Sequence, residues 1–133
     1  MDKKVLVADV PDVRARVAAV LAQERPVFVH TLATALNALA AEDYDLVLIG
    51  LHFDDSRMFD LVREVRAGAR NGAVPIICLR MRPFAFAAIS MQVIEVTVKA
   101  LGAQAFADIA SYGSEADGNA ALALLVASAR GSG

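Results

Sequence analysis

Short apolar runs, each followed by a segment with helical spacing, are the feature that most constrains the fold. Four runs rich in β-branched residues read as buried strands, because continuous apolar character is typical of strands that are covered on both faces. They are residues 5–8, 27–30, 45–50 and 74–79, and the shorter run QAFAD at 104–108 gives a fifth strand. The chain therefore presents five strands in regular succession.

Helical patterns fill the intervals between these strands. The segment 13–24 places valines on one face and is predicted to end at Pro26. Thr31 is a suitable cap for the next helix, and Ser56 for the helix at 57–68. A long segment, 80–101, begins as a loop around Pro83, becomes a helix and is expected to end at Gly102; the last helix runs from Ser114 to about Arg130.

Five strand–helix units predict a (βα)5 fold, which is an α/β class with a doubly wound parallel sheet. The expected strand order is 2-1-3-4-5, the flavodoxin-like arrangement, with right-handed crossovers. We expect a single domain over residues 1–130 and a flexible tail at 131–133. In such sheets the functional site lies at the carboxyl ends of the strands, here residues 8–10, 50–52 and 79–80.

Composition excludes several classes of function. The chain has 133 residues, 57% of them hydrophobic, and a formal net charge of −2. No basic patch indicates a nucleic-acid partner, and no apolar run reaches the ~18 residues of a membrane span. The single cysteine, Cys78, allows no intrachain disulfide and is expected in the core, so a cytoplasmic location fits best.

The order of motifs resembles the receiver domains of two-component response regulators. KVLVADVPDVR is similar to the family's first strand and acidic turn, and YDLVLIGLHFDD followed by FDLVREVR to its third strand, active-site loop and next helix. VPIICLR is similar to the fourth strand, and LGAQAF to the segment around the fifth. The resemblance covers residues 4 to about 130 and implies the receiver fold.

The resemblance also implies phosphoryl transfer from a histidine kinase to an aspartate, but this sequence lacks the residues for it. Gly50 stands at the position of the nucleophile, and Val10 replaces one residue of the acidic pair that holds Mg²⁺, leaving Asp9. Arg80 takes the place of the hydroxyl residue, and the lysine position falls near Asp108 or Ile109. We therefore expect a pseudo-receiver that cannot be phosphorylated at the usual site, with no metal, no cofactor and no enzymatic activity.

Four polar residues near the expected pocket allow more than one interpretation. Arg80 is expected either to pair with Asp9 in place of a metal ion or to point into solvent. His52, which in the family contributes a backbone carbonyl, reads as an ordinary loop histidine. Asp54 and Asp55 are weak alternative acceptors, because no lysine or hydroxyl stands ready to stabilise a transferring phosphoryl group.

The segment 80–101 is longer than its counterpart in a typical receiver and apolar around most of its circumference, so part of it is expected to meet another protein. The alternative is that the additional residues fold as a lid over the phosphorylation pocket and bury Phe84 and Phe86 in the chain's own core. A lid and a protein contact are compatible with each other. By resemblance, the contact face involves the fourth helix, the fifth strand and the last helix. Its expected residues are Phe84, Phe86, Met91, Ile94, Val96, Val98, Phe106 and Tyr112, with Leu124 also left for a neighbour.

The expected partners are a histidine kinase, a phosphotransfer protein or a second copy of this chain, with a homodimer favoured. The competing hypothesis is a flavodoxin-like module that binds a small molecule or nucleotide at the strand ends. Against that hypothesis, the turn after the first strand reads ADVPDV and carries no glycine-rich phosphate loop.

Overall fold

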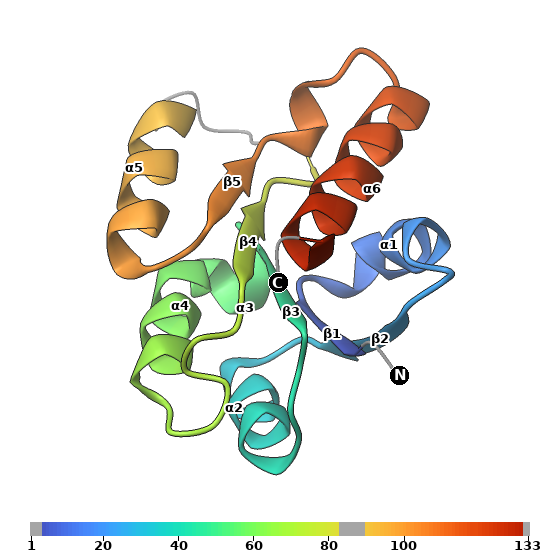
Figure 1. Cartoon of the computed structure of the whole chain (residues 1–133). Coiled ribbons are helices and arrows are strands. Elements are labelled where there is room, and N and C mark those ends of the chain that lie inside the picture. Colours follow the sequence, from blue (N-terminus) through green and yellow to red (C-terminus); the bar gives the residue numbers. More distant parts are fainter. Residues whose placement is uncertain (1–3, 83–89, 132–133) are drawn as a thin grey trace.

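A computed structural model describes residues 4–82 and 90–131 (Figure 1). Its centre is a five-stranded, all-parallel sheet in the order β2-β1-β3-β4-β5, which confirms the predicted topology. The strands are β1 (Lys4–Ala8), β2 (Arg25–Val29), β3 (Leu46–Gly50), β4 (Ile76–Leu79) and β5 (Ala105–Ala107). The central strand β3 is buried along its whole length, as its uninterrupted apolar sequence predicts.

Helices cover both faces of the sheet, and Figure 1 shows them as two layers. One face carries α1 (Arg14–Val20), which follows the short helix η1 (Pro11–Val13), together with α6 (Glu115–Gly131). The other face carries α2 (Leu32–Ala41), α4 (Met58–Ala67) and α5 (Met91–Leu101). The short helices α3 (Phe53–Ser56) and η2 (Ile109–Ser111) follow β3 and β5.

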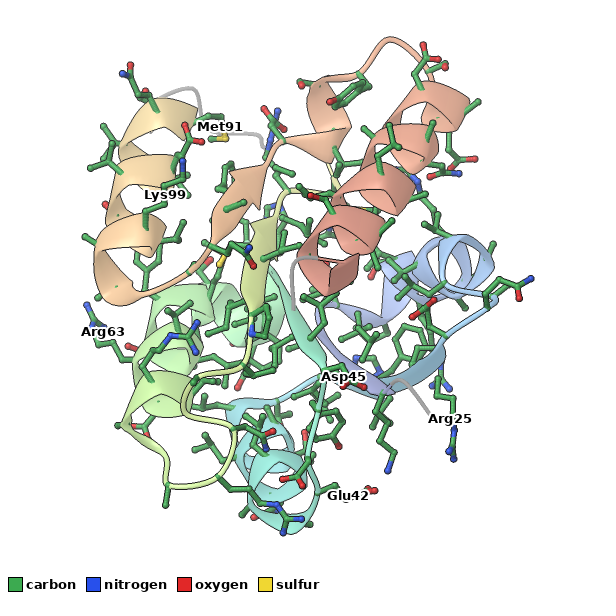
Figure 2. All side chains as sticks on the ribbon, in the orientation of Figure 1. Arg25, Glu42, Asp45, Arg63, Met91 and Lys99 are labelled. Carbon is green, nitrogen blue, oxygen red and sulfur yellow. The ribbon has the colours of Figure 1, made fainter. Side chains whose placement is uncertain are left out.

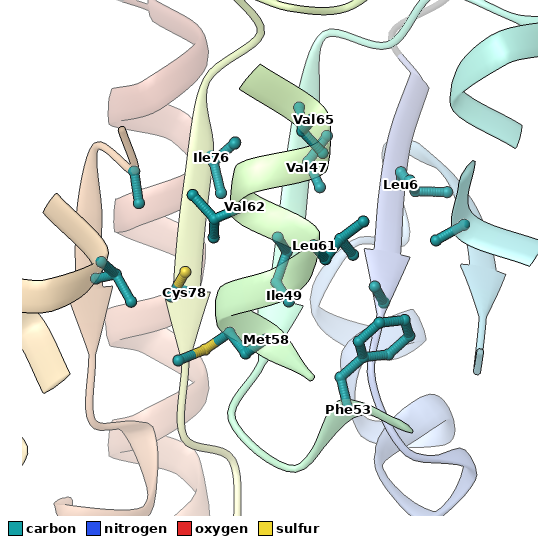
Figure 3. Close-up of a cluster of buried hydrophobic side chains, with 14 of the residues drawn as sticks. Leu6, Val47, Ile49, Phe53, Met58, Leu61, Val62, Val65, Ile76 and Cys78 are labelled. Carbon is teal, nitrogen blue, oxygen red and sulfur yellow. The ribbon is translucent and has the colours of Figure 1, made fainter. Parts of the chain in front are cut away.

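The core consists of two apolar layers that alternate along each strand. In β1, Leu6 and Ala8 join the layer under α2, α4 and α5, whereas Val5 and Val7 join the layer under α1 and α6. Figure 3 shows the first layer, with Leu61 and Val62 of α4 packed across β3 and β4. Each fully buried aliphatic side chain contributes about 1.5–3 kcal/mol to the free energy of folding. Cys78 is buried in this layer, as expected.

Several predicted helix ends are confirmed. The hydroxyl of Thr31 accepts a hydrogen bond from the Thr34 N–H at 3.2 Å and caps α2. Ser114 accepts from the Asp117 N–H at 3.1 Å at the start of α6. Gly102 ends α5 with a φ of 116°, a left-handed conformation that glycine adopts without steric cost.

Other predicted boundaries are wrong. Ser56 does not cap α4, whose capping position is Arg57, because Ser56 belongs to a tight turn before that helix. Helix α1 ends at Val20, well before Pro26, which lies inside β2. An edge strand tolerates proline because one side of its backbone has no strand to pair with. Gly131, expected in a flexible tail, belongs to α6, and residues 132–133 lie outside the described residues. Within the described ranges, no helix combines the length and apolar character needed to span a membrane.

Candidate functional site at the carboxyl ends of the strands

Asp9, Gly50, Arg80 and Asp108 stand at or just beyond the carboxyl ends of β1, β3, β4 and β5. Parallel strands bring these ends to one edge of the sheet, so residues distant in sequence meet there. The strand order decides which of them are neighbours. Strand β3 lies between β1 and β4, whereas β4 and β5 are adjacent.

The carboxyl group of Asp9 covers Gly50. A Cβ atom on Gly50 would overlap the carboxyl carbon and both carboxyl oxygens of Asp9. Asp9 is only 5% exposed, and its carboxyl oxygen accepts a hydrogen bond from the Val10 N–H at 2.8 Å. The absence of a side chain at position 50 therefore creates the space that the Asp9 side chain fills.

The side chain of Asp9 is removed from water, and this burial destabilises the ionised form of its carboxyl group. Burial raises the pKa of Asp9 from 3.8 to about 6, and the bond from Val10 and the positive charge of Arg82 oppose that rise. Nδ1 of His30 lies 3.0 Å from the Asp9 carbonyl oxygen, within hydrogen-bond distance. The site thus holds a carboxyl group that changes its protonation state near neutral pH.

Arg80 pairs with Asp108. Its Nε and one terminal nitrogen donate to the two carboxylate oxygens of Asp108 at 2.6 and 3.0 Å, a bidentate geometry. The expected pairing with Asp9 is therefore wrong, and so is the alternative of a solvent-directed arginine. The physical reason is distance: neighbouring strands are about 4.8 Å apart, and β1 is two strands from β4, whereas β5 is next to it.

A second arginine, Arg82, lies at the mouth of the site. Its guanidinium donates to the Asp12 carboxylate at 2.6 Å, just after β1. An open pocket of about 370 Å³ lies beside it, lined by Val10, Pro11, His30, His52, Asp54, Asp55, Ser56 and Arg82. Burial, with the positive charge of Arg82, lowers the pKa of His52, so this histidine is neutral at pH 7. The side chain of Val10 also lines this pocket and, unlike a carboxylate, has no oxygen that could bind a metal ion.

The loop after β3 contains a feature that the sequence did not predict. Asp54, Asp55 and Ser56 have φ values of 43°, 55° and 68°, three consecutive left-handed residues without a glycine. Such residues cost about 1 kcal/mol or more each. The turn is anchored by Phe53, which is fully buried, and by the Asp54 carboxylate, which accepts from the Leu32 N–H at 2.8 Å. The only sequence signal is that aspartate tolerates this conformation better than most residues.

The described residues do not fit a magnesium ion. A Mg²⁺ site requires several converging oxygen ligands. Across residues 4–82 and 90–131, no three or more His, Cys, Asp or Glu side chains are grouped so that they could hold a metal. Asp9 stands alone among the strand ends, because Gly50 offers no carboxylate and Asp108 is occupied by Arg80.

Only some of the residues expected on the contact face are exposed. Val96 is 62% exposed and Tyr112 48%, whereas Ile94 and Val98 are buried in the core layer under α5. Helix α5 has two apolar flanks. The flank with Ile94, Val98 and Leu101 packs on the core, and the flank with Val93 and Val96 is exposed. Met91 and Phe106 are partly buried, and Phe84 and Phe86 lie outside the described residues.

An open groove of about 770 Å³ runs along the same edge of the molecule, between α6 and the segment that contains β5 and η2. It is lined by Phe106, Ala107, Asp108, Ile109, Ser111, Tyr112, Ala121, Leu124, Leu125 and Ser128. In Figure 2, Met91 and Lys99 mark α5, on the other side of β5 from α6. The apolar surface of this edge therefore has two parts, the outer flank of α5 and the groove beside α6.

Comparison with known proteins bears on the fold. No family model and no curated protein matches the sequence. Among solved structures, a response regulator from Hahella chejuensis is similar with a TM-score of 0.79 and 24% identity, over 96% of this chain and 95% of that chain. The phosphorylated cyanobacterial phytochrome response regulator RcpA is similar with a TM-score of 0.75 and 15% identity, over 96% and 93%.

A third similar structure is the receiver domain of the sensor histidine kinase PA1611 from Pseudomonas aeruginosa, with magnesium in its active-site cleft. Its TM-score is 0.69 at 20% identity, over 98% of this chain and 99% of that chain. The chain therefore has the flavodoxin-like fold of response-regulator receiver domains. At these identities the likeness establishes the fold, and function is argued from the site.

Proposed function

We propose that this chain is a pseudo-receiver of two-component-type signalling, which acts by binding a protein and has no catalytic activity of its own. The observation that carries the proposal is the placement of the Asp9 carboxyl over Gly50. A phosphoryl acceptor at the end of β3 needs a side chain there, and this volume is taken. The receiver fold supports the signalling context, since solved structures with this fold are response regulators and a histidine-kinase receiver.

The ion pair between Arg80 and Asp108 supports the same proposal. These residues follow β4 and β5, where the receiver resemblance implies a hydroxyl and a lysine that meet phosphoryl oxygens. Here Nε and one terminal nitrogen of the guanidinium both donate to Asp108. A cation already paired in this way has less capacity to neutralise a transferring phosphoryl group.

The edge formed by α5, β5 and α6 is the proposed contact surface. The exposed large apolar side chains among the described residues all lie on α5, just after η2 or on α6: Val93, Val96, Tyr112 and Leu124. Clustered exposure of this kind is typical of interaction sites. We propose a second copy of this chain as one partner, in a homodimer, and a histidine kinase or phosphotransfer protein as another.

The cellular setting follows from the same proposal. A two-component partner places the chain in the cytoplasm, and a buried single cysteine suits a reducing compartment. The chain has a formal net charge of −2, which gives no electrostatic reason for nucleic-acid binding.

Beryllofluoride with Mg²⁺, followed by amide chemical-shift mapping, tests the loss of phosphorylation directly. The expected result is no shift change at Gly50, Arg80 or Asp108 at concentrations that saturate a phosphorylatable receiver used as a positive control. Incubation with acetyl phosphate should leave the intact mass unchanged. A mass gain of one phosphoryl group would overturn the proposal, and its loss in an Asp54→Asn, Asp55→Asn variant would place the acceptor in that loop.

A further inference from the structure

Arg80 is joined to the segment after β5 at several points. Its N–H donates to the Ala107 carbonyl at 3.0 Å, and its own carbonyl accepts from the Ala110 N–H at 2.9 Å. In addition to these two backbone bonds, the guanidinium donates two hydrogen bonds to the Asp108 carboxylate. Residues 107–110 are therefore held to Arg80, the residue just after β4, by main chain and side chain together.

The segment that Arg80 holds is one wall of the groove. Asp108, Ile109, Ser111 and Tyr112 line it on the side of β5 and η2. The opposite wall belongs to α6, whose start is held separately: Nε of Arg16 donates to Asn119 at 2.7 Å. The start of α6 is thus held by an arginine other than Arg80, and its buried residues Leu122 and Val126 pack in the core.

Apart from Arg80, the wall beside β5 is held by the side chain of Ile109, which is 2% exposed in the core layer under α1 and α6, and by the contacts of a short edge strand. Strand β5 has three residues, lies at the edge of the sheet and pairs with β4 alone. Within η2, the Tyr112 N–H bonds to the Ile109 carbonyl at 3.3 Å, and the Ser111 hydroxyl donates to the Asp108 carbonyl at 2.7 Å. Short edge elements of this kind open locally at low energy unless a specific contact restrains them.

The Arg80–Asp108 pair is well suited to provide that restraint. The two side chains are 15% and 22% exposed, so solvent screens the pair less than a surface ion pair. A bidentate guanidinium–carboxylate contact fixes direction as well as distance. Its loss removes the side-chain restraint on Asp108 and leaves the two backbone bonds of Arg80.

We propose that the Arg80–Asp108 pair is a built-in latch that sets the shape of the groove between β5–η2 and α6. Through this latch, the groove keeps its shape without any group bound at the strand ends. The inference rests on the proposed function in one respect only, namely that the groove belongs to the contact surface.

Hydrogen exchange of the amides in residues 107–112 tests the latch, in Arg80→Gln, Asp108→Asn and the double variant. We expect each single variant to exchange about tenfold faster there, the factor that corresponds to one charge-assisted hydrogen bond. The strands β1 and β3 should keep their protection, and the double variant should exchange no faster than either single one. Asp43→Asn is the matched control, because it removes the 2.8 Å Arg70–Asp43 contact away from the groove.

Unchanged exchange in 107–112, an equal increase throughout the domain, or additive effects in the double variant would each overturn the latch. The methyl resonances of Leu124 and Leu125 report the groove itself, and they should move in the latch variants but not in Asp43→Asn. Binding separates the two proposals. If exchange in residues 107–112 rises while self-association and kinase binding are both unaffected, the latch stands and the groove is not the contact surface. If the phosphorylation test is positive, the proposed function fails, but the exchange measurement still tests the latch.

Discussion

The carboxyl group of Asp9 occupies the volume in which a side chain on Gly50 would stand. The two residues end neighbouring strands, β1 and β3, so their side chains compete for the same space above the sheet. A glycine at the end of β3 is therefore a packing requirement of this particular site and not simply a missing functional group.

Gly50→Ala should lower the free energy of unfolding by about 1–3 kcal/mol, the usual cost of forcing a methyl group into a packed interior. Urea denaturation followed by circular dichroism measures the change. Gly113→Ala is the matched control and should have little effect, because nothing lies within 4 Å of a Cβ atom at that position.

The cost should depend on Asp9. In an Asp9→Ala background the space above Gly50 is vacant, so Gly50→Ala should then be nearly neutral. The same destabilisation in both backgrounds would contradict direct competition between the two side chains.

Asp9 should also make stability depend on pH. Because its pKa in the folded state is about 6 and its ordinary value is 3.8, the folded protein binds more protons between these values. Its stabilising contribution is therefore complete below pH 3.8 and is lost as the pH rises through about 6.

The variant Asp9→Asn removes this ionisation while keeping an oxygen to accept from the Val10 N–H. We expect it to be more stable than the wild type at pH 7, by up to about 3 kcal/mol, and nearly equal to it at pH 4. Thermal unfolding at both pH values measures the difference. A gain of the same size at pH 4 would show that ionisation is not its cause.

The two flanks of α5 should respond differently to a charge. Val96→Glu is expected to leave the fold intact, because the side chain is exposed, and to weaken self-association measured by light scattering. Ile94→Glu buries a charge against the sheet and should unfold the domain. Ala19→Glu is the control, because Ala19 is an exposed residue of α1, away from the surface formed by α5, β5 and α6. If the wild type is a monomer at high concentration, the homodimer is removed from the proposal.

Cys78 should be inert in the folded protein. Burial raises the pKa of its thiol to about 12, and the side chain has no exposed surface. Reaction with a thiol reagent at pH 8 should therefore follow global unfolding and accelerate with urea in step with the loss of structure. Fast labelling in native buffer would contradict this placement of the residue.

The sheet could be predicted from the sequence because its signal is local. The runs at 5–8 and 45–50 are apolar enough to be buried on both faces, and alternation with helices leaves few topologies. Boundaries were less certain where a residue fits two elements, as Pro26 fits both a helix end and an edge strand.

The site could be predicted only in part because side-chain contacts depend on three-dimensional neighbours. The strand order alone argues for Asp108 over Asp9 as the partner of Arg80, but the direction of the guanidinium depends on the backbone after β4. Similarly, the periodicity of α5 separates two apolar flanks, yet it does not say which one faces the sheet. The left-handed turn at residues 54–56 has almost no sequence signal, because it is imposed by the burial of Phe53 and the bond to Leu32.

The Arg80–Asp108 pair has a consequence for the rate at which charged molecules approach this end of the sheet. Opposite charges a few ångströms apart form a dipole, whose field falls off with distance faster than that of a lone cation. A site that presented an unpaired cation would draw anions inward and speed their encounter. The carboxyl ends of β4 and β5 offer a small phosphorylated donor no such attraction, so its collisions with this part of the site occur without electrostatic guidance.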